Sequence, residues 1–285
     1  NGYEVSYMNS GKMTNKGWEF RVDAVPFENR DWRVGFYFNI AHNENKITEM
    51  PDNYTEENYT FNNGEYAYRR EEGRPMGSFY GYRYKGVCQN KDATYARDAD
   101  GNVMKDISGN AIVMRNGTAT IAPGDALYED INHDGVINQY DIVYLGNSNP
   151  RFTGGAGVNV SYKQFKLSAI FYGRYGQDVV NSTRLNNESM RGIDNQSTAV
   201  LRRWRNEGDQ TDIPRALYGE GYNTLGSDRF VEDASYLRLK SLSFNYRLPK
   251  KIIQRWGFNN IDVYVTGYNL FTWTKYTGQD PEVKT

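Results

Sequence analysis

The chain has 285 residues, of which 15% are aromatic, and its formal net charge is −1. A charge so close to zero excludes nucleic-acid binding driven by bulk positive charge, so we expect no nucleic-acid partner. No run of residues approaches the ~20 consecutive apolar side chains of a membrane-spanning helix. The single cysteine, Cys88, excludes an intrachain disulfide framework, and we expect it to be a passive side chain.

Alternation of apolar and polar side chains predicts a series of strands. Residues 1–10 already read like the middle of a strand, so we expect the chain to be a segment of a longer protein. The clearest alternating stretches are 18–24, 32–43, 155–162, 165–174 and 261–271. A period of two gives a sheet with one apolar and one polar face. Soluble sandwiches share this pattern, so it does not identify the fold by itself.

Short and long connections alternate between these strands. Residues 26–31 and 162–166 are tight turns, and a longer compact connection covers 248–260. The long, polar connections cover 43–76, 87–149 and 175–233. An up-and-down sheet collects the short turns at one end and the long loops at the other, as in outer-membrane barrels. We therefore predict an all-β fold, a segment of a large antiparallel transmembrane β-barrel with long extracellular loops.

The barrel prediction assigns an environment to each face of the sheet. The outer face meets lipid, whereas the inner face and the loops are polar. Ten apolar side chains are expected to face outward: Trp18, Phe20, Val34, Phe36, Phe38, Val158, Leu167, Ala169, Phe171 and Val263.

One predicted strand, SYLRLKSLSFNYRLP, changes phase near Ser241, because Leu237 and Leu242 fall on opposite faces. A β-bulge would explain the change. The alternative is that the upper part of the strand rises clear of the membrane, where the lipid pattern no longer applies. We favour this second explanation, because Arg238 and Lys240 lie in that upper part.

Four blocks of sequence carry a family resemblance. They are GRPMGSFYGYRYKGVCQ (73–89), GDALYEDINHDGVINQYDIVYLGNSNPRFTGG (124–155), DRFVEDASYLRLKSLSFNYRLP (228–249) and VYVTGYNLFTWTKYTGQDPEV (263–283). In this order they resemble recurring blocks of the SusC/RagA-type TonB-dependent outer-membrane transporters, in the C-terminal part of the β-barrel. Together they span nearly the whole chain.

The resemblance implies a role in nutrient uptake across the outer membrane of a Gram-negative, Bacteroidota-like bacterium. The family barrel has about 22 strands around a plug, and residues 1–285 would supply its C-terminal portion without the plug domain. The implied partners are a SusD-like surface lipoprotein, outer-membrane lipid, an oligosaccharide or peptide substrate, and TonB, which acts through a part of the protein not in this chain. The resemblance assigns no substrate-binding residues here. The alternative is a secreted, calcium-stabilised β-rich module that binds glycans or acts as an adhesin.

A calcium-type loop covers residues 130–141, within LYEDINHDGVINQYDIVYLG. Calcium loops place oxygen ligands at positions 1, 3, 5, 7, 9 and 12, with a glycine at position 6 for a sharp turn. The corresponding residues are Asp130, Asn132, Asp134, the carbonyl of Val136, Asn138 and Asp141, with Gly135 at the turn. We expect Ca²⁺ in a structural role. Magnesium remains an alternative, because the final aspartate is shorter than the usual glutamate.

The remaining candidate residues suggest little chemistry. His42 and His133 have no acid or nucleophile at a recognisable spacing, so we expect no enzymatic activity. Residues 98–102 have the composition of a hairpin turn. The stretch LRRWRNEGD (201–209) is expected to form a solvated helical face with Trp204 packed beneath it. Its alternative role is a contact for an anionic ligand or a partner, since arginine and tryptophan favour interfaces.

Overall fold

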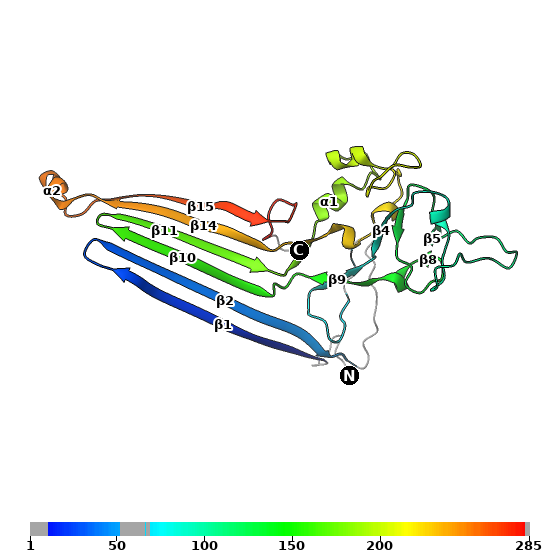
Figure 1. The fold of residues 1–285 in the computed structure, drawn as a ribbon, viewed down its shortest axis with the longest axis horizontal. Helices are drawn as coiled ribbons and strands as arrows, with labels where there is room; N and C mark the ends of the chain where they lie inside the picture. The colour runs from blue at the N-terminus through cyan, green and yellow to red at the C-terminus, as the bar shows by residue number, and fades with distance from the viewer. Residues whose placement is uncertain (1–10, 52–65, 67–68, 283–285) are drawn as a thin grey trace, which may run out of the picture.

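The structure is a computed structural model that describes residues 11–51, 66 and 69–282 (Figure 1). Residues 1–10, expected to be strand, and much of the expected loop 43–76 lie outside the described residues. Six long strands form one antiparallel sheet in the order β1-β2-β10-β11-β14-β15. Their bounds are β1 Lys12–Glu28, β2 Trp32–Glu49, β10 Phe152–Tyr162, β11 Phe165–Tyr175, β14 Tyr236–Arg247 and β15 Asp262–Thr274.

The short connections all lie at one end of this sheet and the long ones at the other (Figure 1). At the short end, the side chain of Asn29 accepts hydrogen bonds from the backbone N–H groups of Asp31 and Trp32 and closes the β1–β2 turn. The β10–β11 turn places Lys163 in the left-handed region, with φ 50°. The β14–β15 connection contains α2 (Lys250–Ile253) and η6 (Gln254–Trp256).

Strand pairing places the apolar side chains in rows on one face. The central row runs Ala24, Phe36, Val158, Ala169, Leu242 and Gly267. Aromatic rows bound this face at both ends: Trp32, Tyr162, Phe165 and Tyr246 near the short turns, and Trp18, Phe152 and Tyr175 near the long loops. All ten side chains expected to face outward lie on this face. It is open, and Phe36 and Phe20 are 40% and 53% exposed.

The opposite face is polar. On it the Ser168 hydroxyl donates to the Asn159 side chain over 2.7 Å, and the hydroxyls of Ser243 and Thr266 lie 2.8 Å apart. The sheet therefore has one apolar and one polar face, as period-two alternation predicts.

The phase change in β14 is a β-bulge, which is the explanation that we did not favour from the sequence. The register with β11 shifts between Ile170 and Phe171, and Lys240 has no cross-strand partner in β11 or β15. One extra residue in a strand shifts the alternation of side chains by one position. Odd-numbered residues before the bulge and even-numbered residues after it therefore lie on the same face. Leu239 and Leu242 consequently both lie on the apolar face.

The β1–β2 ladder extends further than the sequence suggests. β2 continues to Glu49, past the expected loop start at residue 43, and its polar end pairs with residues 12–17 of β1. Backbone hydrogen bonds hold a ladder together whatever the side chains are, so a polar strand end stays paired when its neighbour is equally long.

The long connections fold into a region with small sheets and its own core (Figure 1). Its strands are β3 Ser78–Gly81, β4 Tyr84–Val87, β5 Arg115–Asn116, β6 Ala119–Thr120, β7 Ala126–Tyr128, β8 Val136–Ile137, β9 Val143–Asn147, β12 Asp178–Val180 and β13 Val231–Asp233. Its helices are α1 Ser182–Asn187 and the 3₁₀ turns η1 Asp92–Thr94, η2 Gln139–Asp141, η3 Thr198–Arg202, η4 Tyr222–Thr224 and η5 Asp228–Phe230. One core cluster contains Cys88, Ala96, Met114, Ile121, Ala126, Tyr128 and Ile137. No helix in the described part of the chain has the length and apolar character to cross a membrane.

Candidate functional site in the loop region

The calcium-type loop, residues 130–141, follows β7 and contains β8 and η2. It is fastened to the loop-region core by Ile137, whose side chain is 1% exposed. Gly135 has φ 79°, and a β-carbon there would lie 3.0 Å from the β-carbon of Ala96. Only glycine adopts this conformation without strain, so the sharp turn requires it. The Arg115 N–H donates to the Gly135 carbonyl, which ties the loop to β5.

The first half of the loop is organised by its own side chains. The Asp130 carboxylate accepts hydrogen bonds from the backbone N–H of Asp134 (3.2 Å) and of Gly135 (2.7 Å). The Asn132 side-chain oxygen also accepts from the Asp134 N–H, and the Asp134 carboxylate accepts from the Val136 N–H. These bonds wrap the backbone around the carboxylates, which brings the side-chain oxygens into one turn.

The second half of the loop ends in a capped 3₁₀ turn. Asn138 caps η2 by accepting from the Tyr140 N–H over 2.9 Å, and its amide donates to the Val136 carbonyl over 3.0 Å. The Asp141 carboxylate reaches back to the loop and accepts from the N–H groups of Ile131 and Asn138, each at 2.8 Å. The first and last parts of the loop are therefore held together through Asp141.

Asp141 is a buried acid, and the described part of the chain gives it no cationic partner. It is 0% exposed, and burial raises the pKa of its carboxyl, to which the nearby charge of Asp130 adds. Hydrogen bonds from backbone N–H groups only partly offset this effect. None of the ion pairs among the described residues includes Asp130, Asp134 or Asp141. A buried carboxylate favours a nearby positive charge.

The donor set of the loop suits a hard cation, because Ca²⁺ and Mg²⁺ prefer carboxylate, amide and carbonyl oxygens. The carboxylates of the loop do not by themselves form a full set of metal ligands. Within the described ranges, no group of three or more His, Cys, Asp and Glu side chains is placed to hold a metal ion. Asn132 and the Val136 carbonyl would have to contribute, and Val136 would first release the Asn138 amide. The burial of Asp141, which backbone hydrogen bonds offset only in part, is the observation that a cation at this loop would explain.

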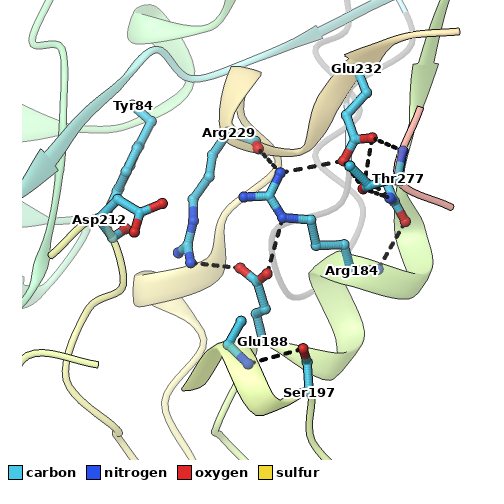
Figure 2. A network of polar contacts seen from close by, with 10 residues as sticks. Tyr84, Arg184, Glu188, Ser197, Asp212, Arg229, Glu232 and Thr277 are labelled. Carbon is cyan, nitrogen blue, oxygen red and sulfur yellow. Dashed lines mark hydrogen bonds and ion pairs between the residues drawn. The ribbon is translucent and has the colours of Figure 1, made fainter. Parts of the chain in front are cut away.

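A second polar site, which the sequence did not reveal, is a buried charge network in the same region (Figure 2). Glu188, at the end of α1, accepts from Arg184 over 3.0 Å and from Arg229 over 2.8 Å. The Glu188 and Arg229 side chains are 6% and 4% exposed. The Arg229 guanidinium also lies 5.3 Å from the ring centre of Tyr84, while its Nε and one terminal nitrogen are buried without a hydrogen-bond partner.

The network continues through Glu232 to the segment that follows β15. Glu232 accepts from Arg184 over 3.3 Å and from the Thr277 backbone N–H over 2.8 Å. Burial alone would raise the pKa of Glu232, but the hydrogen bonds from Thr277, Asn181 and Arg184 hold it below its ordinary value. Since these groups come from α1, β13 and the chain beyond β15, the network fastens the loop region to the end of the sheet (Figure 2).

The expected helical face over 201–209 is wrong: the 3₁₀ turn η3 ends at Arg202, because the Trp204 N–H then bonds to the Ile213 carbonyl instead of continuing a helix. Trp204 packs tightly on Gly124, where a β-carbon would come within 2.3 Å of its ring. The Cys88 thiol is buried, which raises its pKa to about 11.

Comparisons with known proteins extend over nearly the whole chain. No protein-family model matches it. It is 33% identical over 99% of its length to TonB-dependent receptor P3 of Formosa agariphila, and 26% identical over 97% to TonB-dependent receptor SusC of Bacteroides thetaiotaomicron. Among solved structures it is similar to the RagAB peptide transporter, with a TM-score of 0.67 and 27% identity over 99% of its length. The chain spans about a quarter of the curated relatives, 26% and 25%, and 28% of the solved chain.

Proposed function

We infer that this chain, which matches SusC/RagA-type TonB-dependent receptors along 99% of its length, supplies barrel wall and outer loops to an outer-membrane transporter. The all-β fold, a section of a large antiparallel barrel, agrees with the likeness to the RagAB transporter. The transporter takes up nutrients and is not an enzyme. Residues 1–285 form the C-terminal portion of its barrel, and the plug domain lies elsewhere in the full-length protein.

The open apolar face of the sheet carries this proposal. It runs from the aromatic row at Trp32 to the row at His42, ten residues along β2. At a rise of ~3.3 Å per residue and a tilt of ~40°, this corresponds to roughly 25 Å, the height of the apolar band of an outer-membrane barrel. The secreted-module alternative requires these side chains to meet in a closed core. The smaller sheets instead lie beyond one end of the long strands (Figure 1).

The long loops are proposed to be extracellular and to contact a SusD-like surface lipoprotein. They leave the sheet at one end, at residues 87–149 and 175–233, and fold into a region with its own core (Figure 1). The substrate is an oligosaccharide or a peptide, and the RagAB transporter, a peptide importer, supports the second class. TonB acts through a part of the protein outside this chain.

We expect the full-length protein, purified from native outer membranes in mild detergent, to bring down one surface lipoprotein. A variant in which the exposed hairpin turns 98–102 and 106–110 are each shortened to two residues is a sharper test, because it trims projecting hairpins and leaves the core of the loop region and the long sheet in place. The lipoprotein yield should fall while the barrel still assembles. Recovery of the intact receptor with no lipoprotein companion would contradict the partner assignment.

We also propose that the loop 130–141 binds Ca²⁺ and that the ion has a structural role. Asp130, Asn132, Asp134, the Val136 carbonyl, Asn138 and Asp141 would hold it. The ion would supply the positive charge that the buried Asp141 lacks. Through Ile137 and the Arg115–Gly135 hydrogen bond, it would also order the neighbouring hairpins. Mg²⁺ is the competing ion, and the two differ in ligand distance, ~2.3–2.6 Å against ~2.0–2.1 Å.

The double variant Asp130→Ala/Asp134→Ala is expected to lose the ion, because two of the three carboxylates are removed. The calcium affinity of the full-length receptor should fall by about 10²-fold or more. The loop should become sensitive to protease, while the barrel assembles normally. The matched control is Asp98→Ala/Asp106→Ala, which removes two carboxylates from neighbouring hairpin turns. Calcium binding that survives equally in both variants would refute the site.

A further inference from the structure

The apolar face of the sheet is hollowed near the loop end of its strands. A groove of about 680 Å³ lies there, with Gly154, Gly173 and Ala156 at its floor. Its walls are large apolar side chains: Phe38, Ile40, Phe152, Phe171, Leu237 and Trp273. The floor residues belong to β10 and β11, and the wall residues come from these two strands and from β2, β14 and β15.

The hollow is fixed by the backbone. Gly154 and Gly173 are cross-strand partners, so two neighbouring positions of one row lack a side chain. A β-carbon at Gly154 would lie 2.6 Å from the Asn39 carbonyl oxygen, and one at Gly173 would lie 2.7 Å from the Tyr236 carbonyl oxygen. Larger residues cannot occupy either position without moving a strand. The sheet therefore keeps a gap of two side chains in a row that Ile40 and Leu237 bound on either side.

An apolar gap of this kind needs an apolar occupant. Leu237 and Trp273 on its wall are 48% and 53% exposed. If the gap stayed empty, these side chains would lose van der Waals contacts on one side, and water would gain no hydrogen-bond partners there. A hydrocarbon chain lying along the groove supplies the missing contacts.

The rim of the groove carries a positive charge. Lys275 follows β15 and lines the groove at the loop end, and no ion pair of Lys275 is found among the described residues. Asp233 at the same rim is anionic and accepts two hydrogen bonds from Ser235, and the cationic Arg174 also lines the groove, so the formal charge of these lining residues is +1. An exposed lysine beside an aromatic row at the edge of an apolar band suits a phosphate group.

We propose that this groove binds an outer-leaflet lipid, one acyl chain lying over Gly154 and Gly173 and a phosphate lying beside Lys275. The proposal rests on the proposed function, which places the loop end of the sheet at the outer leaflet. The ligand class is a phosphorylated, multiply acylated glycolipid of the lipid A type. Site-bound lipid would hold the wall where β10 and β11 leave the membrane for the loop region.

The test is native mass spectrometry of the full-length receptor, titrated in detergent with diphosphoryl lipid A or with phosphatidylethanolamine. Ala156→Phe fills the floor of the groove and should weaken the tightest lipid A site roughly tenfold, since several buried methylene contacts are lost. Ala169→Phe adds the same bulk to the same face outside the groove and should leave that site unchanged. Lys275→Gln should weaken lipid A about fivefold, whereas Lys251→Gln, at the opposite end of the sheet, should have no effect.

Equal lipid A affinity in the two alanine variants would overturn the proposal. So would a site that depends on Ala156 but binds phosphatidylethanolamine as tightly as lipid A and ignores Lys275. Fractionation of the same cells separates this failure from a failure of the proposed function. If the wild-type receptor is absent from the outer membrane, the proposed function is wrong, whereas a correctly located receptor with an unresponsive groove refutes the lipid site alone.

Discussion

Replacing Glu188 by alanine is expected to destabilise the loop region by about 3–5 kcal/mol, the cost of breaking a buried ion pair by removing one partner. Within the part of the chain that the structure describes, Glu188 is the one hydrogen-bond acceptor of the Arg229 guanidinium, and it also accepts from Arg184. Arg229 is 4% exposed and already has two nitrogens without hydrogen-bond partners. Without Glu188, its charge would stay buried with little beyond aromatic rings to stabilise it.

Hydrogen exchange of the full-length receptor measures this effect locally. The α1 amides should exchange roughly 10² to 4 × 10³ times faster in Glu188→Ala, because each 1.4 kcal/mol is a factor of ten. Glu129→Ala is the control: Glu129 pairs with Arg83 and Lys85 at a more exposed site, where about 1 kcal/mol or less is expected. The double variant Glu188→Leu/Arg229→Met removes both buried charges and should recover most of the protection. Equal exchange in Glu188→Ala and Glu129→Ala would contradict the role of the network.

The two faces of the sheet could be predicted from the sequence because each strand carries its pattern locally. Phe36 and Phe38 alternate with Tyr37 whatever the strand pairs with, so period two reveals the face before any partner is known. The order of short and long connections then indicated a meander, and the structure has that topology.

The bulge in β14 could not be located in the same way. A phase change near Ser241 shows that the pattern breaks, but the cause depends on the register with β11 and β15. The register between β14 and its neighbours is set only when the strands pair in the folded sheet. The cationic residues beside the break suggested an exposed strand, whereas Lys240 lies 3.4 Å from Glu282 on the polar side.

The two candidate sites also differ in whether their residues are close together in the sequence. The loop 130–141 is local, so the spacing of its oxygen-bearing residues is visible in twelve consecutive positions. The charge network joins Tyr84, Arg184, Arg229 and Thr277, which are far apart in the chain. A single arginine or glutamate in a polar stretch has no feature that distinguishes a buried ion pair from a solvated side chain. Only the fold brings these charges together.

Replacing Phe36 by arginine is expected to destabilise the barrel by about 2–4 kcal/mol, the cost of a charge on the lipid-facing side near the membrane midplane. Phe36 lies in the central apolar row, between the aromatic rows at Trp32 and His42, so its side chain is far from either interface. The measurement is the urea midpoint of the full-length receptor folded into phospholipid vesicles, which should fall for the variant.

Asn159→Arg is the matched control for Phe36→Arg. Asn159 lies on the polar face of β10, paired with Gly35 beside Phe36, so the same charge would enter a polar environment at nearly the same height. A change of less than about 1 kcal/mol is expected there, because the side chain stays solvated. If both arginines lowered the midpoint equally, the two faces would meet the same environment, and the sheet would not be the wall of a membrane barrel. A large effect at Phe36 alone requires that the exposed apolar face is in contact with lipid.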